Sequence, residues 1–347
     1  MTSHSSPRPR LFHTLRAGTF ACLLFLFIPV SSVFPQNTDG TQMLDDDLLI
    51  GIYTDFRVVD GDTFRIKGMD RGVRFLNIDT EEVPRGSDAR EKLARLRENW
   101  PEAYVEERGS SRFPVKMASP YGWETSEAAK RWFEDVDTIR IERDSDDNVY
   151  GFFDRWLGFV FARKNGRWIN YNVECVRMGW SPYYGKYGYS ERFHDEFVAA
   201  QQEAEQAQHG IWNPALQHYP DYDERLEWWN ERGDAIQTFI SRFRGDETYY
   251  FIGRDGEFER LALAQGQRVV VFGAIGWLPR SRPAEKLRIS HKRGMNVTIP
   301  LSFDVSEEWL LDREQQYVYV RGVVSGGGKN IVVTPEKAAD VSLDPLQ

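Results

Sequence analysis

The chain contains little cysteine, no surplus of positive charge and no long apolar run beyond residue 35, and each absence excludes a class of protein. Two cysteines in 347 residues exclude a disulfide-rich scaffold and a zinc ribbon. A formal net charge of −9 argues against a protein that coats nucleic acid through bulk positive charge, although it allows a local basic cleft. After residue 35, no segment approaches the ~20 apolar residues that a membrane-spanning helix needs.

The sequence also lacks the pairings that mark nucleophilic catalysis. No histidine has an evident cysteine or serine partner, and no glycine-rich loop of the kind that cradles phosphates is present. Cys175 lies in the apolar pattern of residues 172–176, so we expect a buried and inert thiol.

The sequence contains enough apolar residues to form large cores. Hydrophobic residues make up 41% of the chain and aromatic residues 14%, with 11 tryptophans, which excludes wholesale disorder. At ~150 residues per domain, a chain of 347 residues predicts about two domains.

The first 35 residues have a composition of their own. Arg8, Arg10 and Arg16 precede an apolar run that ends near the small residues Ser31 and Ser32, which is the pattern of a secretory signal peptide. We therefore expect a secreted or periplasmic protein, with a signal peptide over residues 1–35 and a polar linker over 36–48. An uncleaved N-terminal membrane anchor is the alternative, and no integral span would remain after removal of a signal peptide.

Residues 49–213 predict an α+β domain. Period-two patterning and an Asp-Gly turn favour strands at the start of this region, and amphipathic patterning favours helices later. Strands are expected at 56–59, 63–66, 73–78, 138–141 and 156–162, helices at 125–134 and 190–209, and a polar insertion at 83–119 with a short helix at 87–99.

The rest of the chain predicts a second domain. Residues 214–246 are expected to form a linker that includes a connecting helix over 222–243. Residues 247–340 then show about five short strands separated by turns that contain glycine or proline, which favours a small all-β domain, an OB-like barrel.

A cluster of carboxylates and an arginine follows the Asp-Gly turn. Asp62, Arg74, Asp79, Thr80 and Glu82 lie close together in the sequence. Carboxylate and carbonyl oxygens are ligands for hard cations, and the planar arginine fork matches a phosphate, so these residue types suit metal-assisted phosphodiester hydrolysis. Acids at turns are also common on solvated faces. Because Arg74 and Asp79 start on opposite faces of a strand, a twist or bulge must re-aim Asp79 if the two act together.

The motifs give the cluster a second reading. Residues 59–63 (VDGDT) followed by 73–82 (VRFLNIDTEE) resemble the staphylococcal nuclease (thermonuclease) family, whose pattern is an Asp-Gly-Asp-Thr turn and an arginine strand that enters Asp-Thr-Pro-Glu. Residues 154–161, 172–179 and 209–212 match later pieces of that family in the same order, so the resemblance covers about residues 52–212.

The resemblance implies a five-stranded OB-type barrel with helices that cleaves DNA or RNA with one Ca²⁺. Asp62 and Asp79 would be the metal carboxylates, and Thr80 would offer its carbonyl oxygen. Glu82 would orient or deprotonate the attacking water.

The resemblance also implies which residues contact the substrate. Arg74 and Arg155 would clamp the phosphoryl oxygens and stabilise the transition state. Tyr187 falls where the family has a tyrosine that lines the nucleotide pocket. A second tyrosine position holds Gly185, with Tyr184 next to it.

Departures from the family pattern concern the surroundings of the site. Glu81 replaces the family's proline and adds a charge beside the expected metal site. Phe152, Phe153 and Asp154 stand where the family has Lys-Tyr-Gly, so a contact with a terminal phosphate is lost. The insertion 83–119 is longer than the family's mobile loop, and we expect it to cover the substrate groove.

A basic stretch in the predicted second domain could make a further contact with nucleic acid. It consists of Arg280, Arg282, Lys286, Arg288, Lys292 and Arg293. A solvated, charged hairpin is the alternative. Trp277 and Trp309 could stack on bases or fill the core.

Two readings of function therefore stand side by side. The first is a secreted, Ca²⁺-dependent nuclease that hydrolyses phosphodiester bonds of DNA or RNA, and the presence of the full set of acids and arginines favours it. The second is a noncatalytic module of the cell envelope that binds nucleic acid or protein on a nuclease-like barrel. A barrel that binds another protein or a glycan is a third possibility.

Overall fold

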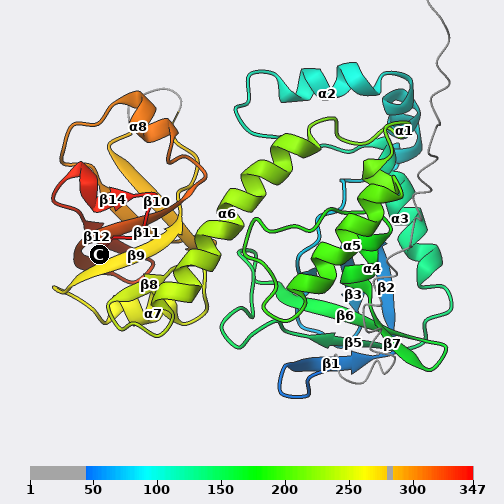
Figure 1. Cartoon of the computed structure of the whole chain (residues 1–347), viewed down its shortest axis with the longest axis horizontal. Helices are drawn as coiled ribbons and strands as arrows, with labels where there is room; N and C mark the ends of the chain where they lie inside the picture. Colours follow the sequence, from blue (N-terminus) through cyan, green and yellow to red (C-terminus); the bar gives the residue numbers. More distant parts are fainter. Residues whose placement is uncertain (1–43, 280–283, 347) are drawn as a thin grey trace, which may run out of the picture. The chain divides into compact units, whose positions relative to one another are not determined.

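The structure is a computed structural model that describes residues 44–279 and 284–346 (Figure 1). The predicted signal peptide and most of the predicted linker lie outside the described residues, as do Arg280 and Arg282 of the basic stretch. The described part contains two mixed sheets in one compact unit, with the long helix α6 (Tyr222–Phe243) between them in sequence.

The first sheet has seven strands, which pair in the order β1-β5-β6-β4-β3-β2, with β7 paired to β6. These are β1 (Leu49–Tyr53), β2 (Phe56–Asp60), β3 (Thr63–Ile66), β4 (Val73–Phe75), β5 (Ile139–Glu142), β6 (Trp156–Lys164) and β7 (Arg167–Asn170). The pair β4·β6 is parallel and the others are antiparallel. In the core below the sheet, the ring of Phe64 meets Phe75 and Phe133 edge to face at 4.7 Å, an arrangement that favours one packing of the rings.

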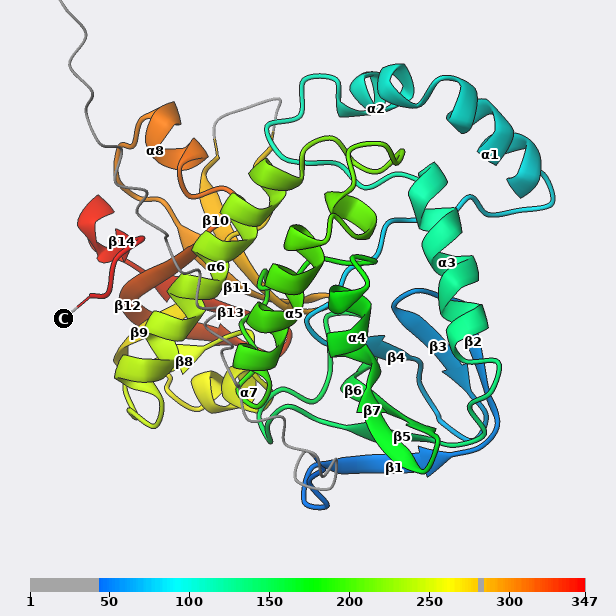
Figure 2. The same cartoon turned by 45° about the vertical axis from the view of Figure 1, so that its right-hand side comes forward.

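Helices accompany this sheet. They are α1 (Ala89–Glu98), α2 (Trp100–Arg108), α3 (Pro120–Trp132), α4 (Tyr171–Arg177), α5 (His194–Gln206) and the short 3₁₀ helix η1 (Gly210–Trp212). Helices α3 and α4 contact the sheet at β2 and β6, respectively (Figures 1 and 2). The α+β class expected from the sequence is confirmed, while the pairings describe a mixed sheet and do not by themselves close a barrel.

Helix α3 begins earlier than expected. The sequence predicted a start at Thr125, but Ser119 caps the helix by accepting a hydrogen bond from the backbone N–H of Gly122. Pro120 fills the first helical position, where a backbone N–H has no partner in any case. The cap and the proline therefore add one more turn.

The second sheet pairs in the order β10-β11-β13-β12-β9-β8, with β14 paired to β12. Its strands are β8 (Tyr249–Phe251), β9 (Arg268–Ala274), β10 (Lys286–Lys292), β11 (Met295–Pro300), β12 (Tyr317–Gly327), β13 (Asn330–Thr334) and β14 (Val341–Ser342). Two short helices, α7 (Glu257–Ala262) and α8 (Glu307–Leu311), and the 3₁₀ turn η2 (Ala338–Asp340) interrupt it. The region is β-rich, so the expectation of an all-β domain was too strict.

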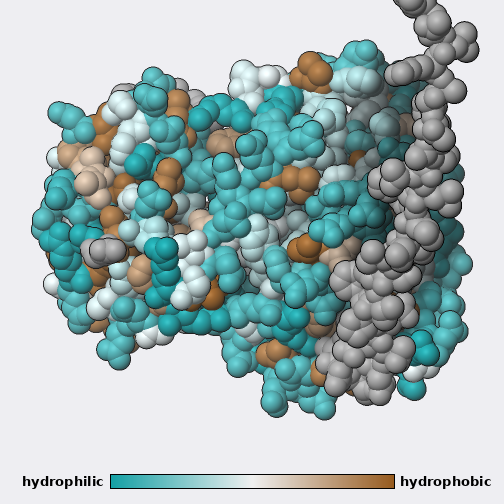
Figure 3. Space-filling model, in the orientation of Figure 1, coloured by the Kyte–Doolittle hydropathy of each residue, from teal (hydrophilic) through white to brown (hydrophobic). Residues whose placement is uncertain are grey.

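The face shown in Figure 3 is mostly hydrophilic, with small separate apolar patches. Among the residues that the structure describes, no helix is both long enough and apolar enough to cross a bilayer.

Candidate active site

Arg74 brings the two predicted metal carboxylates together. From strand β4, its Nη1 lies 2.6 Å from Oδ2 of Asp62, which sits in the turn between β2 and β3. Its Nη2 bonds to Oδ1 of Asp79 and lies 3.1 Å from the carbonyl oxygen of Ile78. Both carboxylates are buried. One guanidinium thus fixes the spacing of two acids that are 17 positions apart in the printed sequence.

A bend after β4 makes this contact possible. Asn77 has a φ of 59°, in the left-handed region, so the strand stops at Phe75 instead of continuing to residue 78. The Asn77 side chain donates to the carbonyl of Gly188 at 2.9 Å, and the Asp79 backbone N–H donates to Ser181 Oγ at 2.8 Å. Strand alternation alone would place Arg74 and Asp79 on opposite faces, and this bend turns Asp79 toward Arg74.

Thr80 closes the turn around Asp62. Its backbone N–H donates to Asp62 Oδ2 at 3.0 Å, while Thr63 Oγ1 donates to Oδ1 at 3.0 Å. A Cβ on Gly61 would lie 2.6 Å from the Thr80 methyl, so glycine is required there for this close approach. Asp60, in the same turn, pairs with Arg85 at 3.1 Å. Burial and the charge of Asp62 raise the pKa of Asp60 to about 6.

A hard cation would have to compete with Arg74 and Lys116 for the carboxylates of Asp62 and Asp79. Asp62 and Asp79 supply carboxylate oxygens at one place, and Thr80 follows Asp79 directly. Within the described ranges, no cluster of three or more His, Cys, Asp or Glu side chains could hold a metal. A cation would therefore take its remaining ligands from backbone, water and phosphate oxygens, as Mg²⁺ and Ca²⁺ commonly do.

Lys116 is the site residue that sequence reasoning missed. Its Nζ lies 2.5 Å from Oδ2 of Asp79, so Asp79 faces two cations. Burial favours the neutral acid, but the charges of Lys116 and Arg74 outweigh it and lower the pKa of Asp79 to about 2. No motif marks Lys116, because a single lysine in a charged insertion has no distinguishing neighbours.

Glu82 combines a fixed backbone with a partly exposed side chain. Its side chain lines the same cavity and makes no hydrogen bond or ion pair with any other described residue. Its backbone is fixed by α3, since a Cβ on Gly122 would lie 2.2 Å from the Glu82 carbonyl oxygen. A rigid backbone and an unengaged carboxylate suit a group that holds or accepts a proton.

Glu81 lines the cavity, but the charge that the sequence placed beside the expected metal site is engaged elsewhere. Its carboxylate turns away to the start of the connecting segment, where it accepts hydrogen bonds from Ser119, from the Tyr219 backbone N–H at 2.7 Å and from Tyr222 at 3.0 Å. Burial raises the pKa of Glu81 to about 7, against these hydrogen bonds, which lower it.

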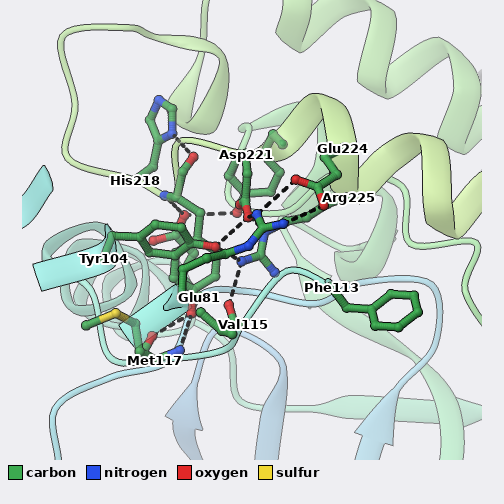
Figure 4. Close-up of polar contacts among 12 residues, drawn as sticks. Glu81, Tyr104, Phe113, Val115, Met117, His218, Asp221, Glu224 and Arg225 are labelled. Carbon is green, nitrogen blue, oxygen red and sulfur yellow. Dashed lines mark hydrogen bonds and ion pairs between the residues drawn. The ribbon is translucent and has the colours of Figure 1, made fainter. Parts of the chain in front are cut away.

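The same region ties the insertion to α6, as Figure 4 shows. Tyr104 of α2 donates to Asp221 at 2.5 Å, and Arg225 of α6 donates to that tyrosine at 2.7 Å and to the Val115 carbonyl at 2.5 Å. Arg108 adds an ion pair with Glu224 at 2.6 Å. The insertion is thereby held as a fixed part of the molecule.

The second predicted arginine, Arg155, also faces the cavity. No carboxylate among the described residues pairs with it, in contrast to Arg74. Burial and the positive charge of Arg74 lower the pKa of Arg155, while Asp62, Asp60 and Asp79 act in the opposite direction. An unpaired guanidinium beside a paired one leaves a position for an anion.

Both predicted tyrosines line the cavity but differ in access. Tyr187 is 63% exposed. Tyr184 is buried, with its ring edge-on to Trp229 at 4.7 Å and to Tyr187 at 5.8 Å. Tyr187 is therefore free to meet a ligand, while Tyr184 supports it from below.

The cavity joins the two halves of the described structure. It measures about 660 Å³ and takes its lining from the first sheet, from α6 and from the second sheet. Of the insertion, only Arg85 and Lys116 line it; helices α1 and α2 do not. Only residues near the two ends of the insertion therefore reach the cavity.

The described residues of the predicted basic stretch lie on different surfaces. Lys286 and Arg288 point to the exposed face of β10, whereas Lys292 lines the cavity and pairs with Asp255 at 2.9 Å. Arg293 is exposed after that strand. Trp277 is 61% exposed on the cavity, while Trp309 packs on the core of the second sheet.

Comparisons with known proteins concern the first domain as a segment of sequence. Residues 72–214 match the family model described as staphylococcal nuclease homologue, which confirms the resemblance over that segment. The match supports a nuclease-like domain of OB-related α+β fold, and nucleases of this family are typically metal-dependent. An uncharacterized protein of Methanocaldococcus jannaschii, MJ1439, is 24% identical over 159 residues, which are 45% of this chain and 69% of that protein.

Proposed function

We propose that this chain is a Ca²⁺-dependent nuclease that hydrolyses phosphodiester bonds of DNA or RNA. The observation that carries the proposal is that Arg74 holds Asp62 and Asp79 together in one cavity, beside an unpaired Arg155 and an unengaged Glu82. The family match over residues 72–214 supports it. These groups are the parts that metal-assisted hydrolysis requires.

The chemistry divides between binding and proton transfer. When bound by Asp62, Asp79 and the Thr80 carbonyl, the cation would supply Lewis-acid stabilisation of the phosphoryl oxygens. Arg155 and Arg74 donate hydrogen bonds to the same oxygens, where negative charge grows in the transition state.

Glu82 takes the part of the base in this reaction. It orients a water molecule for in-line attack and accepts the proton that the water loses as its oxygen bonds to phosphorus. The bond from phosphorus to the leaving sugar oxygen breaks, and that oxygen takes a proton from solvent. No covalent enzyme intermediate is required.

Cleavage assays with and without metal test the proposal. The chain from residue 36 onward is incubated with single-stranded DNA and RNA, in Ca²⁺ or in a chelator. We expect cleavage that needs Ca²⁺ and is lost in Glu82→Ala. Glu106→Ala, an exposed acid that does not line the cavity, is the matched control and should cleave normally.

The opposite result would identify the alternative function. A folded protein that binds these strands but cleaves neither of them in any divalent cation would contradict the nuclease and favour the noncatalytic binding module.

We also propose that the protein is exported, because residues 1–35 have the pattern of a signal peptide. Sequencing the N-terminus of protein recovered from the cell envelope or the medium tests this. An N-terminus near residue 36 supports cleavage, and an intact Met1 supports the anchor.

A further inference from the structure

The cavity contains a second group of cations away from the two carboxylates. Most of the cations that line it are neutralised: Arg85 by Asp60, Arg74 and Lys116 by Asp62 and Asp79, Arg254 by Asp147, and Lys292 by Asp255. Apart from Arg155, two lining cations have no carboxylate partner among the described residues. They are Lys186 and Arg232.

Arg232 is buried and, within the described ranges, hydrogen-bonded only to neutral groups. Its guanidinium donates to the carbonyl oxygens of Gln315 and, at 3.3 Å, Lys186, and it lies over the ring of Tyr317 at 4.6 Å. Gln315, whose carbonyl accepts this hydrogen bond, has a φ of 63°, in the left-handed region. The fold thus holds a buried positive charge in place without neutralising it.

Lys186 adds a second charge at the same place. Its Nζ lies over the Trp228 ring at 4.2 Å and has no ion-pair partner in the part of the chain that the structure describes. Burial and the charge of Arg232 lower the pKa of Lys186 to about 7. Two adjacent cations without an acid are costly to bury, so an anion that neutralises them would be stabilised there.

Exposed aromatic side chains line the same cavity as these two cations. In the described ranges, four phenylalanine, tyrosine or tryptophan side chains are exposed, and all four line this cavity: Phe152, Phe153, Tyr187 and Trp277. Trp277 belongs to the segment after β9 of the second sheet, whereas the others come from the first half. Exposed rings interleaved with cations are how proteins hold unstacked bases and the phosphates between them.

We propose that Lys186 and Arg232 form a second phosphate site, and that the substrate is a single strand of nucleic acid held between the two sheets. This proposal rests on the proposed nuclease function and specifies its substrate. Tyr187 and Trp277 stack on bases of that strand, while Arg74 and Arg155 bind the phosphate that is cleaved. A cavity of about 660 Å³ takes one or two nucleotides of a strand at a time, in the size range of small-ligand sites, and does not suit a duplex.

Binding without cleavage tests the site. The affinity of fluorescently labelled single-stranded DNA and RNA for the full chain is measured by anisotropy in a chelator. Lys186→Gln should bind about tenfold more weakly or worse, because a charge-assisted hydrogen bond to phosphate is lost. Lys329→Gln, which removes the same charge from an exposed turn outside the cavity, should bind like the wild type.

A second variant tests the contribution of the second sheet. Trp277→Ala should weaken binding by about tenfold, whereas Leu263→Ala, exposed but outside the cavity, should not. Both tested side chains are at least partly accessible, so the variants should fold, and thermal unfolding checks this. A duplex of the same sequence should bind more weakly than either single strand.

The phosphate itself can come from within the strand or from its end. Strands with a 5′-phosphate or a 5′-hydroxyl distinguish the two: if the effect of Lys186→Gln disappears with the 5′-hydroxyl strand, the site holds a terminal phosphate. If the effect persists, the site holds an internal one. Either result supports the site.

Equal affinity of Lys186→Gln and Lys329→Gln for both strands would overturn the proposal. That outcome is separable from failure of the nuclease: a wild type that cleaves but is insensitive to Lys186 refutes the second site alone. A wild type that binds through Lys186 and never cleaves refutes the hydrolysis alone.

Discussion

The guanidinium of Arg74 supports both the fold and the chemistry of the site, and two substitutions separate these roles. Arg74→Ala would leave Asp62 and Asp79 buried together without their shared cation, which costs several kcal/mol of stability as well as about 3 kcal/mol of transition-state stabilisation. Arg74→Lys keeps the charge but loses the fork that bonds two groups at once.

We therefore expect Arg74→Lys to fold with a Tm near that of the wild type and to cleave about 10²–10³-fold more slowly, as when one donor to a developing oxyanion is removed. Thermal unfolding and single-turnover cleavage measure the two effects. Arg131→Lys, at an exposed arginine near the end of α3 that does not line the cavity, is the control. Cleavage by Arg74→Lys at the wild-type rate would show that the fork does not contact the phosphate.

Lys186 should make the stability of the protein depend on pH in a defined direction. Its pKa is about 7 in the folded protein, lowered by burial and then by Arg232 and Lys116, whereas an unfolded lysine has a pKa near 10.5. Between these values the unfolded chain binds more protons than the folded one, so the free energy of unfolding gains from this group as pH rises from 7 to about 10. The rings of Tyr187 and Trp228 face the ammonium group, and the negative charge of Asp79 acts against the lowering of its pKa.

Urea unfolding at pH 7 and pH 9.5 checks this. The wild type should gain about 2–3 kcal/mol relative to Lys186→Met over that interval, because the methionine has no proton to lose. Parallel pH profiles of the two proteins would show that Lys186 is charged or solvated throughout.

At the scale of elements, the insertion reaches the cavity through Arg85, which pairs with Asp60, and through Lys116, which pairs with Asp79. Deleting residues 83–119 would remove Ser119 and Tyr104 and so disrupt the network around Glu81 and Asp221, which makes deletion a poor test of substrate choice. Lys116 is the residue through which the insertion reaches Asp79, and its ammonium group lies where a cation would approach that carboxylate.

We expect Lys116→Gln to bind Ca²⁺ several-fold more tightly than the wild type, because a competing charge on Asp79 is removed. Isothermal titration calorimetry measures this without any substrate. Lys92→Gln, which removes an insertion lysine that pairs with Asp88 on the surface, is the matched control. Weaker Ca²⁺ binding by Lys116→Gln would mean that Lys116 supports the carboxylate geometry instead of competing.

The elements also show what sequence can predict here. The hairpin of β2 and β3 and its acidic turn follow from local patterning, and the need to bend the chain before Asp79 followed from strand alternation. Lys116, Lys186 and Arg232 could not be predicted, because their roles depend on segments that meet only after folding. Arg232 and the Gln315 carbonyl are such a pair, 83 positions apart.

At the scale of the whole molecule, an acidic protein has to attract an acidic polymer. The net charge of −9 opposes long-range attraction, so binding depends on the few cations inside the cavity that lack acidic partners. Among the residues that the structure describes, these are Arg155, Lys186 and Arg232.

The number of such cations predicts the salt dependence of binding. Each phosphate neutralised on a single strand contributes about −0.7 to the slope of log K against log salt concentration, so the two phosphates bound by these three cations predict a slope near −1.4. Anisotropy titrations of a single-stranded oligonucleotide between low and physiological salt, in a chelator, measure this slope. A slope near −5 or steeper would require an extended basic track outside the cavity, and the exposed Lys286 and Arg288 on β10 would then be the first residues to replace.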